Sequence, residues 1–299
     1  MGQGSPAGNH RGCGGWLGGA GRIGRATLQE LKDAGHSAWA LDRVLVSEGA
    51  ARRSFICDLA DAGAVYGALG AMKAEGPVDG VIHLGAFPNL SFHPAEHVFV
   101  NNTAGCANVA AACRALGITR VAYASSVTVY AMNAQVKHGA ITRLPLDETL
   151  PAKPDNAYAL SKWVGEQLFT LAGHEWGLQT ASLRPTLVIG PDEWKTPRGQ
   201  PREHPGGLWS HVDSRDVALA ARLAIEKLDT LGPGNHPFNV NAAVSHSRQP
   251  MAEMIARTLP ELAAVTSTLE GMEPALSIEK ARRLLGYEPR YSWQTELAG

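Results

Sequence analysis

The sequence lacks several features that would place it in a membrane or nucleic-acid-binding class. No apolar stretch approaches the roughly 18 residues that a membrane-spanning helix needs. Lys and Arg (27) nearly balance Asp and Glu (28), so the formal net charge is only −1. Such a balance gives no electrostatic argument for nucleic acid or an anionic membrane as a partner. We therefore expect no nucleic-acid partner and no membrane partner.

Cysteine is also scarce, and its spacing excludes some kinds of site. The four cysteines form no C-x-x-C pair and no metal-type spacing with histidine. This pattern is typical of reduced thiols in a cytoplasmic protein, so we expect that location. The eleven histidines are scattered, and we expect no metal site. Hydrophobic residues at 44% and charged residues at 18% are typical of an ordinary globular chain.

The chain alternates between strand-like and helical patterns, which predicts an α/β fold. Strand-like runs lie near 37–41, 53–57, 79–84, 119–125, 179–184 and 236–240, and helical patterns near 23–34, 60–74, 95–116, 156–176 and 214–227. Regular alternation predicts a doubly wound parallel sheet covered by helices on both faces. The predicted units are a large domain of residues 12–190 with 212–240, to which the glycine-rich segment 18–24 and Asp42 assign dinucleotide binding, and a small lobe of residues 191–211 and 241–299, which is expected to bind the substrate.

A glycine-rich loop stands before the first helical pattern. Gly18, Gly21 and Gly24 are spaced three apart, with Arg22 and Ile23 between the last two. Glycines at a helix entry allow a tight turn and let backbone N–H groups approach a diphosphate, which the helix dipole also favours. The loop therefore predicts dinucleotide binding.

An acidic residue follows this loop at the distance expected for ribose recognition. The apolar run 37–41 ends in Asp42, about 20 residues past the loop. An acid there suits hydrogen bonds to the ribose hydroxyls of NAD and repels the 2′-phosphate of NADP. Arg43, beside it, can accommodate that phosphate. We expect NAD as the cofactor, and NADP stays open.

Three further residues carry the chemistry expected of hydride transfer. Tyr158 lies four residues before Lys162 on a predicted helix, so the two side chains share one face. The ammonium is expected to lower the phenol pKa from about 10 and to make Tyr158 a general acid/base. Ser126 directly follows the strand-like run 119–125, where ligands of such sheets bind, so its hydroxyl can hydrogen-bond the substrate oxygen.

These motifs, in this order, resemble the extended short-chain dehydrogenase/reductase superfamily and its NAD-dependent epimerase/dehydratase group. The resemblance covers roughly residues 17–293, and further matching segments are 57–59, 81–86, 102–105, 126–130, 183–191, 209–217 and 277–289. It implies that Asp58 contacts adenine, that the turn at the end of 81–86 lies against the ribose, and that Pro185 belongs to the strand touching the nicotinamide. The implied cofactor-binding set is Gly18, Gly21, Arg22, Ile23, Gly24, Asp42, Asp58, Leu59, Leu84, Gly85, Ala86, Tyr158, Lys162 and Pro185.

The resemblance also implies roles at the catalytic centre. Tyr158 exchanges a proton with the substrate oxygen, and Lys162 lowers its pKa and holds the nicotinamide ribose. Ser126 orients the substrate and stabilises the oxyanion. Asn102 anchors the backbone near the proton relay. The substrate pocket is expected to draw on Phe87, Ser126, Val127, Thr128 and Leu187.

Departures from the family pattern bear on the reaction. Val127 and Thr128 stand where dehydratases carry Asp-Glu, and Leu187 stands where epimerases carry an Asn that contacts the sugar diphosphate. We therefore favour an NAD(P)-dependent oxidoreductase acting on a small alcohol, sugar or carbonyl compound. A nucleotide-sugar epimerase with tightly bound NAD stays open, because Arg198, Arg202 and Arg215 could bind a diphosphate. A non-catalytic dinucleotide sensor is the second alternative.

Two expectations remain. Residues 12–17, Gly-Cys-Gly-Gly-Trp-Leu, take the place of the first and central strand, and their glycines predict a weak strand.

The resemblance implies a homodimer in which helices near 102–116 and 156–172 pair across a two-fold axis. Alanines at 107 and 110–112 would permit close approach of those helices.

Overall fold

A computed structural model describes residues 13–298 of the chain, and its side chains from residue 18 onward. Seven parallel strands form one sheet in the order β3-β2-β1-β4-β5-β6-β9. The strands are β1 (Cys13–Leu17), β2 (Ser37–Asp42), β3 (Arg53–Ile56), β4 (Val78–His83), β5 (Arg120–Ala124), β6 (Gln179–Pro185) and β9 (Gly234–Val240). The direction of winding reverses between β1 and β4, where a doubly wound sheet opens a crevice. The expected fold class is confirmed.

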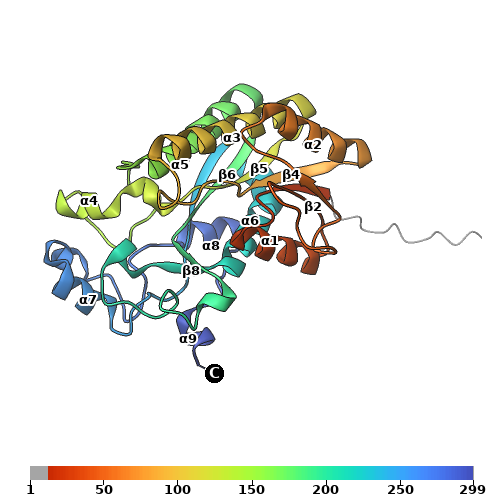
Figure 1. The fold of residues 1–299 in the computed structure, drawn as a ribbon. Coiled ribbons are helices and arrows are strands. Elements are labelled where there is room, and N and C mark those ends of the chain that lie inside the picture. Colours follow the sequence, from red (N-terminus) through yellow and green to blue (C-terminus); the bar gives the residue numbers. More distant parts are fainter. Residues whose placement is uncertain (1–12, 299) are drawn as a thin grey trace, which may run out of the picture.

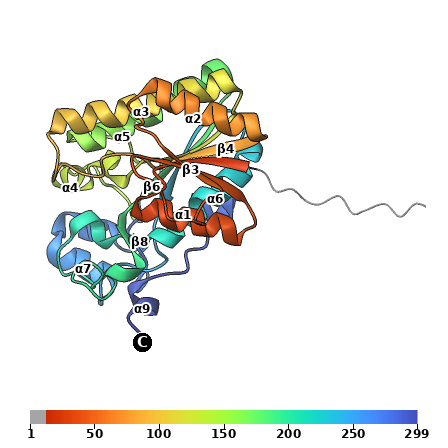
Figure 2. The ribbon, with the colours of Figure 1, turned by 45° about the vertical axis from the view of Figure 1, so that its right-hand side comes forward.

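Helices cover both faces of the sheet (Figures 1 and 2). One face carries α2 (Ala62–Glu75), α3 (Ala95–Leu116) and α5 (Ala157–Trp176). The other carries α1 (Arg22–Asp33), α6 (Ser214–Leu231) and α8 (Glu279–Leu285). The predicted ranges of the five long helices differ from these bounds by at most four residues at either end.

Side chains of β2 show how one strand serves both faces. Ala38 and Ala40 belong to the core beneath α1 and α6, whereas Trp39 and Leu41 belong to the core beneath α2 and α3. All four are buried, as the uninterrupted apolar run predicts for a central parallel strand. The sheet is therefore dry on both faces, and polar ligands can reach it only at its ends.

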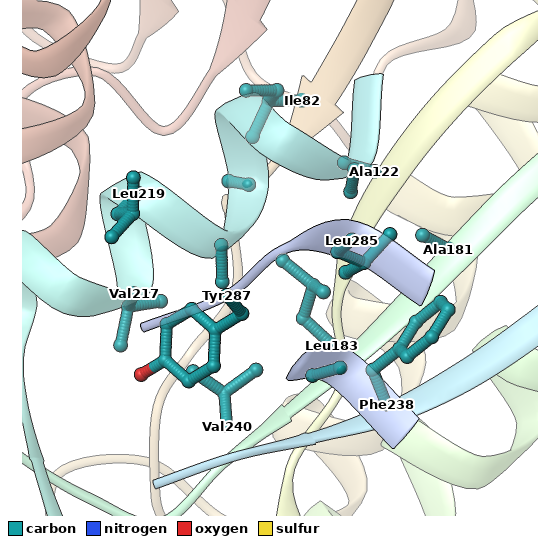
Figure 3. Packing of buried hydrophobic residues seen from close by; sticks show 14 of the residues in the cluster. Ile82, Ala122, Ala181, Leu183, Val217, Leu219, Phe238, Val240, Leu285 and Tyr287 are labelled. Carbon is teal, nitrogen blue, oxygen red and sulfur yellow. The ribbon is translucent and has the colours of Figure 1, made fainter. Parts of the chain in front are cut away.

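The core beneath α6 packs large side chains against small ones (Figure 3). Leu183, Phe238 and Tyr287 are almost fully buried there. Ala122 and Ala181 occupy the neighbouring strand positions, and their small side chains let the helix layer approach the sheet. Tyr287 donates a hydrogen bond from its hydroxyl to the Asn241 carbonyl oxygen at 3.1 Å, which attaches the C-terminal segment to the sheet.

The glycine-rich central strand β1 is present in the sheet. It pairs with β2 along its whole length, and with β4 with a shift of register between Cys13 and Gly15. Neighbouring strands on both sides thus supply its ladder hydrogen bonds. Its predicted weakness stays a prediction, and residue 12 lies outside the described residues.

A third cluster of apolar residues lies beyond the strand ends. It joins residues 127–146, which include η1 (Val127–Tyr130) and α4 (Met132–Lys137), to residues 208–209 and to α7 (Met251–Thr258). Backbone bonds between Leu146 and the 275–277 segment, at 2.8 and 2.7 Å, fix this contact. The expected division into two units stays a prediction, but packing places 127–146 with the lobe and returns residues 278–287 to the main sheet.

The remaining elements lie mostly around this lobe. They are β7 (Leu187–Ile189), β8 (His211–Asp213), η2 (Pro191–Glu193), η3 (Gly206–Trp209), η4 (Pro260–Val265) and α9 (Trp293–Glu296). β7 and β8 pair in parallel, with Leu187 beside His211 and Ile189 beside Asp213, so the segment between them leaves at the end of β7 and crosses back to the start of β8. Within residues 13–298 no helix has the length and apolar character required to cross a membrane.

Candidate active site

The predicted site residues gather at the carboxyl ends of the strands. The glycine loop follows β1, Asp42 ends β2, the 84–87 turn follows β4, and Ser126 follows β5. Gly18 donates from its backbone to the Leu41 carbonyl oxygen at 2.7 Å, which joins the loop to the end of β2. The topology therefore brings the cofactor motifs to one edge of the sheet, as expected for ligand binding in such folds.

The glycine loop can exist only without side chains at two of its positions. Gly18 has φ of 92°, and a Cβ there would lie 2.6 Å from the Gly85 nitrogen. A Cβ on Gly24 would lie 2.0 Å from the Gly18 carbonyl oxygen. Gly21 caps α1 in an extended conformation, so the first N–H groups of that helix face the loop. This exposed backbone at a helix N-terminus fits a dinucleotide diphosphate.

Asp42 and Arg43 have different surroundings. The Asp42 carboxylate accepts the Ala20 N–H at 2.9 Å, which places the acid against the glycine loop. The Arg43 guanidinium forms an ion pair with Asp58 at 3.2 Å and donates to Asn101 Oδ1 at 2.9 Å. It also lies 4.9 Å from the Phe87 ring centroid. Arg43 is therefore held by three neighbours, none of which belongs to the glycine loop.

The turn after β4 packs tightly against the loop after β3. A Cβ on Gly85 would lie 2.4 Å from Leu59 Cδ1, so any larger residue there would displace the Leu59 side chain. The Leu59 carbonyl oxygen accepts the side-chain amide of Asn108 at 2.8 Å, which attaches this loop to α3. The structure thus brings Gly18, Leu59 and Gly85 together, as the resemblance implied.

Helix α5 carries the Tyr-Lys pair and begins at a well-formed cap. The Asn156 side chain accepts the Ala159 N–H at 3.0 Å, so the helix starts just before Tyr158. Lys162 is buried, and its Nζ donates to the Ala124 carbonyl oxygen at 2.7 Å. The same Nζ lies 5.8 Å from the Tyr158 ring centroid. The helix therefore places the ammonium between the end of β5 and the phenol.

Ser126 lies within hydrogen-bonding distance of the phenol. It is buried, and its hydroxyl oxygen accepts the Thr128 N–H at 3.2 Å. A side-chain hydrogen bond with Ser126 lowers the pKa of Tyr158, although burial of the phenol is the larger effect. The three side chains expected at the catalytic centre thus converge at the end of β5.

The expected lowering of the Tyr158 pKa is not found. Burial raises the pKa of Tyr158 to about 12, and the hydrogen bond with Ser126 offsets only part of this rise. Burial also lowers the pKa of Lys162 to about 8. The spacing of the two residues was read correctly, but it does not reveal the loss of hydration that dominates both groups.

Asn102 anchors backbone, as the resemblance implied, but at a specific place. Its side chain accepts the Phe87 N–H at 2.8 Å and donates to the Phe87 carbonyl oxygen at 3.1 Å. It also donates to Ser161 Oγ at 3.1 Å, next to Lys162 on α5. Asn102 therefore fixes the turn after β4 relative to the catalytic helix.

The residues expected to contact substrate lie in three different settings. Phe87 stacks on His93 with 3.9 Å between ring centroids, and His97 packs edge-on against both rings. Val127 is buried, and the Thr128 hydroxyl is buried without a hydrogen-bond partner. Leu187 is half-buried in β7, opposite His211 of β8. The two histidines beside Phe87 were not recognised from the sequence.

Other functional candidates were also missed. Glu166 and Arg184 form a buried ion pair at 2.6 Å behind Ser126. Arg22 was assigned to the cofactor loop, but its ion pair with Glu193 at 2.6 Å, which reaches the segment after β7, was not foreseen. The position of Glu166 four residues after Lys162 was the only available signal for the first pair. Across residues 13–298 no three His, Cys, Asp or Glu side chains could share a metal ion.

Comparisons with known proteins match this geometry. The NAD dependent epimerase/dehydratase family matches residues 17–212. UDP-glucose 4-epimerase of Lacticaseibacillus casei is 27% identical, over 92% of this chain and 91% of the relative. 2-Alkyl-3-oxoalkanoate reductase of Stenotrophomonas maltophilia is 31% identical, over 89% of this chain and 79% of the relative.

A solved structure shows the same fold. A short-chain dehydrogenase/reductase superfamily protein from Agrobacterium tumefaciens, with bound NAD, superimposes with a TM-score of 0.71 at 22% identity. The match covers 96% of this chain and 95% of that protein. By sequence, and with a fold that agrees, the chain belongs to the NAD-dependent epimerase/dehydratase family and is an NAD-dependent enzyme.

Proposed function

We propose that this enzyme is an NAD-dependent oxidoreductase that interconverts a small alcohol or sugar with the corresponding carbonyl compound. The observation that carries the proposal is the convergence of Ser126, Tyr158 and Lys162 at the end of β5, beside the glycine loop and Asp42. NAD would supply the hydride acceptor. The residues of the chain would bind, orient and move the proton.

Each of the three groups has a distinct part in this proposal. The Tyr158 phenol gives its proton to the carbonyl oxygen in reduction and takes it back in oxidation. A raised pKa suits the acid role, because the phenol stays protonated at neutral pH. The Ser126 hydroxyl hydrogen-bonds the same substrate oxygen. The Lys162 ammonium, oriented by the Ala124 carbonyl, offsets negative charge on the phenol as the proton leaves.

The surroundings of Asp42 and Arg43 support NAD rather than NADP. The Asp42 carboxylate lies against the loop that would hold the diphosphate, where it can accept ribose hydroxyls. Arg43 contacts Asp58 and Asn101 through Nη2, so its charge is already partly neutralised and attracts a 2′-phosphate less strongly. Repulsion from Asp42 acts in the same direction.

The same segment also bears on the size of the substrate. Two of the three arginines that could bind a sugar diphosphate are paired elsewhere. Arg198 contacts Glu193 at 3.6 Å and the Val188 carbonyl oxygen at 3.0 Å, and Arg215 pairs with Asp213 and Glu296 at 2.7 and 2.9 Å. With Leu187 in place of an amide, this favours a substrate without a diphosphate.

A nucleotide-sugar epimerase is the second candidate. One observation favours it: Arg202 is half-buried, and burial and the charge of Arg198 lower the pKa of its guanidinium, as expected of a cation that no carboxylate neutralises. The epimerase of Lacticaseibacillus casei also matches nearly the full length of this chain. An epimerase would retain its NAD and would interconvert UDP-glucose and UDP-galactose with no net change in cofactor.

A substrate panel tests both candidates. Purified protein is mixed with NAD and a panel of alcohols, aldoses and sugar acids, or with NADH and 3-oxo acids, and absorbance is followed near 340 nm. We expect at least one compound to be turned over, and Tyr158→Phe to abolish turnover. Tyr66→Phe, on the exposed face of α2, serves as the matched control. Equal behaviour of wild type and Tyr158→Phe across the panel would overturn the proposal, and interconversion of UDP-sugars would favour the epimerase.

We also propose that the protein is a homodimer formed through α3 and α5. Val100 on α3 and Leu171 on α5 are 61% and 52% exposed, and Leu160 on α5 is 38% exposed. These apolar side chains lie on two helices that pack side by side, so a partner copy would cover them (Figure 1). Light scattering at micromolar concentration should give twice the chain mass, and Leu171→Glu should lower it. A monomeric wild type would refute the dimer.

The expected division of labour and location are retained as proposals. Residues 191–211 and 241–299 would form the substrate lobe, and the packing of 127–146 against them supports an addition to it. The described cysteines, Cys57, Cys106 and Cys113, are free and buried, which supports a reducing, cytoplasmic location.

A further inference from the structure

A buried ion pair lies directly behind the proposed catalytic centre. Glu166 and Arg184 are both buried, and the carboxylate accepts Arg184 Nε and Nη2 at 2.8 and 2.6 Å. Such a two-point contact fixes the orientation of both groups. Glu166 lies one helical turn beyond Lys162 on α5, and Arg184 lies on β6. The pair therefore fixes the catalytic helix against the sheet.

The same carboxylate reaches the residue beside Ser126. Ser125 Oγ donates to Glu166 Oε1 at 2.5 Å. Ser125 and Ser126 are consecutive, so their side chains leave the chain in different directions: the first toward the ion pair, the second toward Tyr158. Whatever holds Ser125 therefore also sets the backbone from which the Ser126 hydroxyl projects.

The other side of Ser126 is held by the same network. Arg184 Nη1 donates to the Tyr130 hydroxyl oxygen at 2.7 Å, and that hydroxyl donates to Asn239 Oδ1 at 2.8 Å. Tyr130 ends η1, the single turn that Ser126 begins. The segment 125–130 is thus attached at both ends to one charged pair, with Ser126 between the attachments.

Stability alone does not account for this arrangement. A buried ion pair loses hydration that its mutual attraction only partly returns, and apolar residues of similar volume often serve as well. The pair also makes two contacts that a link between helix and sheet does not need. Glu166 accepts the Ser125 hydroxyl and Arg184 donates to the Tyr130 hydroxyl, at the two ends of segment 125–130. Those additional contacts indicate positioning.

We propose that Glu166 and Arg184 are positioning residues that hold the Ser126 hydroxyl in register with the Tyr158 phenol. Neither touches the substrate or the nicotinamide in this proposal, and both act through Ser125 and Tyr130. The inference rests on the proposed function, because the alignment of the Ser126 hydroxyl with the Tyr158 phenol matters only if both act in that reaction.

Paired substitutions separate positioning from stability. In Glu166→Gln a side-chain NH2 group replaces one carboxylate oxygen, so a donor faces the N–H donors of Arg184. Arg184→Met leaves the Glu166 carboxylate without its cation. Both single variants are expected to lower the unfolding temperature and to lower kcat by about 10- to 100-fold, the scale of a misplacement near 1 Å. The double variant Glu166→Met/Arg184→Met removes both charges, so its unfolding temperature should recover toward wild type while kcat stays low.

A matched control and a milder variant accompany them. Glu30 and Arg222 form an ion pair at 2.8 Å between α1 and α6, away from Ser126. The double variant Glu30→Met/Arg222→Met should keep the kcat of wild type. Ser125→Ala removes one hydrogen bond and little else, and should lower kcat by about 3- to 10-fold with folding intact.

The outcomes distinguish this inference from the proposed function. The substrate is the compound of the panel that the wild type turns over fastest, and NAD binding is followed by quenching of protein fluorescence. We expect NAD affinity within about threefold of wild type in all variants. Recovery of kcat together with stability in the double variant would overturn the positioning role. If wild type neither binds NAD nor turns over the panel, the proposed function fails instead. Crystal structures of wild type and Ser125→Ala would then decide positioning alone: an unchanged separation of Ser126 Oγ and Tyr158 Oη contradicts it.

Discussion

Arg22, in the first turn of α1, forms an ion pair with Glu193 of η2 at 2.6 Å. The same guanidinium reaches the Val188 carbonyl oxygen at 3.5 Å, and the second Glu193 oxygen accepts the Gly190 N–H at 2.7 Å. The pair thus joins the glycine loop to the segment that follows β7. A dinucleotide bound on that loop would lie beside this connection.

Breaking the connection should speed cofactor release. In Glu193→Gln the charge that holds Arg22 is lost, and we expect NADH to dissociate several-fold faster. Both side chains are partly exposed, so the unfolding free energy should change by less than about 1 kcal/mol. Stopped-flow fluorescence of NADH release measures the rate. Glu279→Gln, in an exposed ion pair on α8, is the control, and an unchanged release rate would contradict the expectation.

The glycine loop should tolerate no methyl group at its third glycine. A Cβ at Gly24 would lie 2.0 Å from the Gly18 carbonyl oxygen, so Gly24→Ala must displace the loop. We expect NAD affinity to fall at least about tenfold, since loop hydrogen bonds to the diphosphate would be lost. Gly67→Ala in α2 meets nothing within 4 Å and should leave binding intact, while raising the unfolding free energy by about 0.4–1 kcal/mol. Calorimetric titration with NAD and chemical unfolding measure the two effects.

Cofactor preference should depend on Asp42. Asp42→Asn keeps an oxygen that can accept the Ala20 N–H but removes the negative charge. We expect the ratio of NADP to NAD affinity to rise by about tenfold, which corresponds to about 1.4 kcal/mol of lost repulsion and lost ribose bonding. Fluorescence titration with both dinucleotides gives the ratio. Asp61→Asn, at the cap of α2, should leave it unchanged. An unaltered ratio of NADP to NAD affinity in Asp42→Asn would show that other residues determine the cofactor preference.

The pH dependence should carry the signature of Lys162. Burial lowers its pKa from 10.5 to about 8, so above that pH the amine loses its charge. We expect kcat/KM for NAD to fall with a slope of one proton above about pH 8, because kcat/KM reports the free enzyme. In Lys162→Arg the falling limb should vanish, although the residual activity will be low. A flat profile to pH 10 in wild type would contradict the role.

The lowered pKa of Lys162 also affects stability: the free energy of unfolding should rise with pH, whereas kcat/KM falls. The folded-state pKa lies below the unfolded value, so the unfolded chain binds more protons between about pH 8 and 10.5. Lys162 therefore destabilises the fold fully below pH 8, and this cost decreases as the pH rises through that window. Lys162→Met should remove this contribution to the pH dependence of unfolding.

Much of the fold was visible in the sequence, for local physical reasons. Gly117 and Gly177 end α3 and α5 in left-handed conformations with φ of 64° and 71°, and the predicted ranges 95–116 and 156–176 stop just before these two glycines. The uninterrupted apolar run of β2, residues 38–41, indicated a central strand because both of its faces are covered. Even the glycine-rich β1 was placed correctly, by the loop that follows it.

The site was predictable only in part. Spacing placed Tyr158 and Lys162 on one helical face, and the end of the β5 run singled out Ser126. Spacing gives no measure of burial, so the direction of the Tyr158 pKa shift was wrong. The pairing of Glu166 with Arg184 joins residues 18 positions apart on different elements, and no local pattern encodes it. For the same reason, no local pattern predicts the contact of segment 127–146 with residues 251–276.

The apolar core of the lobe is assembled from three stretches that are far apart along the chain, around residues 127–146, 208–209 and 251–276. During synthesis the first stretch leaves the ribosome more than a hundred residues before the last. Until then Tyr130, Met132 and Leu144 have no complete apolar surroundings, whereas β1–β6 can already pair. Nascent chains that stop short of residue 251 should therefore show a protease-resistant sheet, together with an exposed apolar surface on segment 127–146 that binds chaperones.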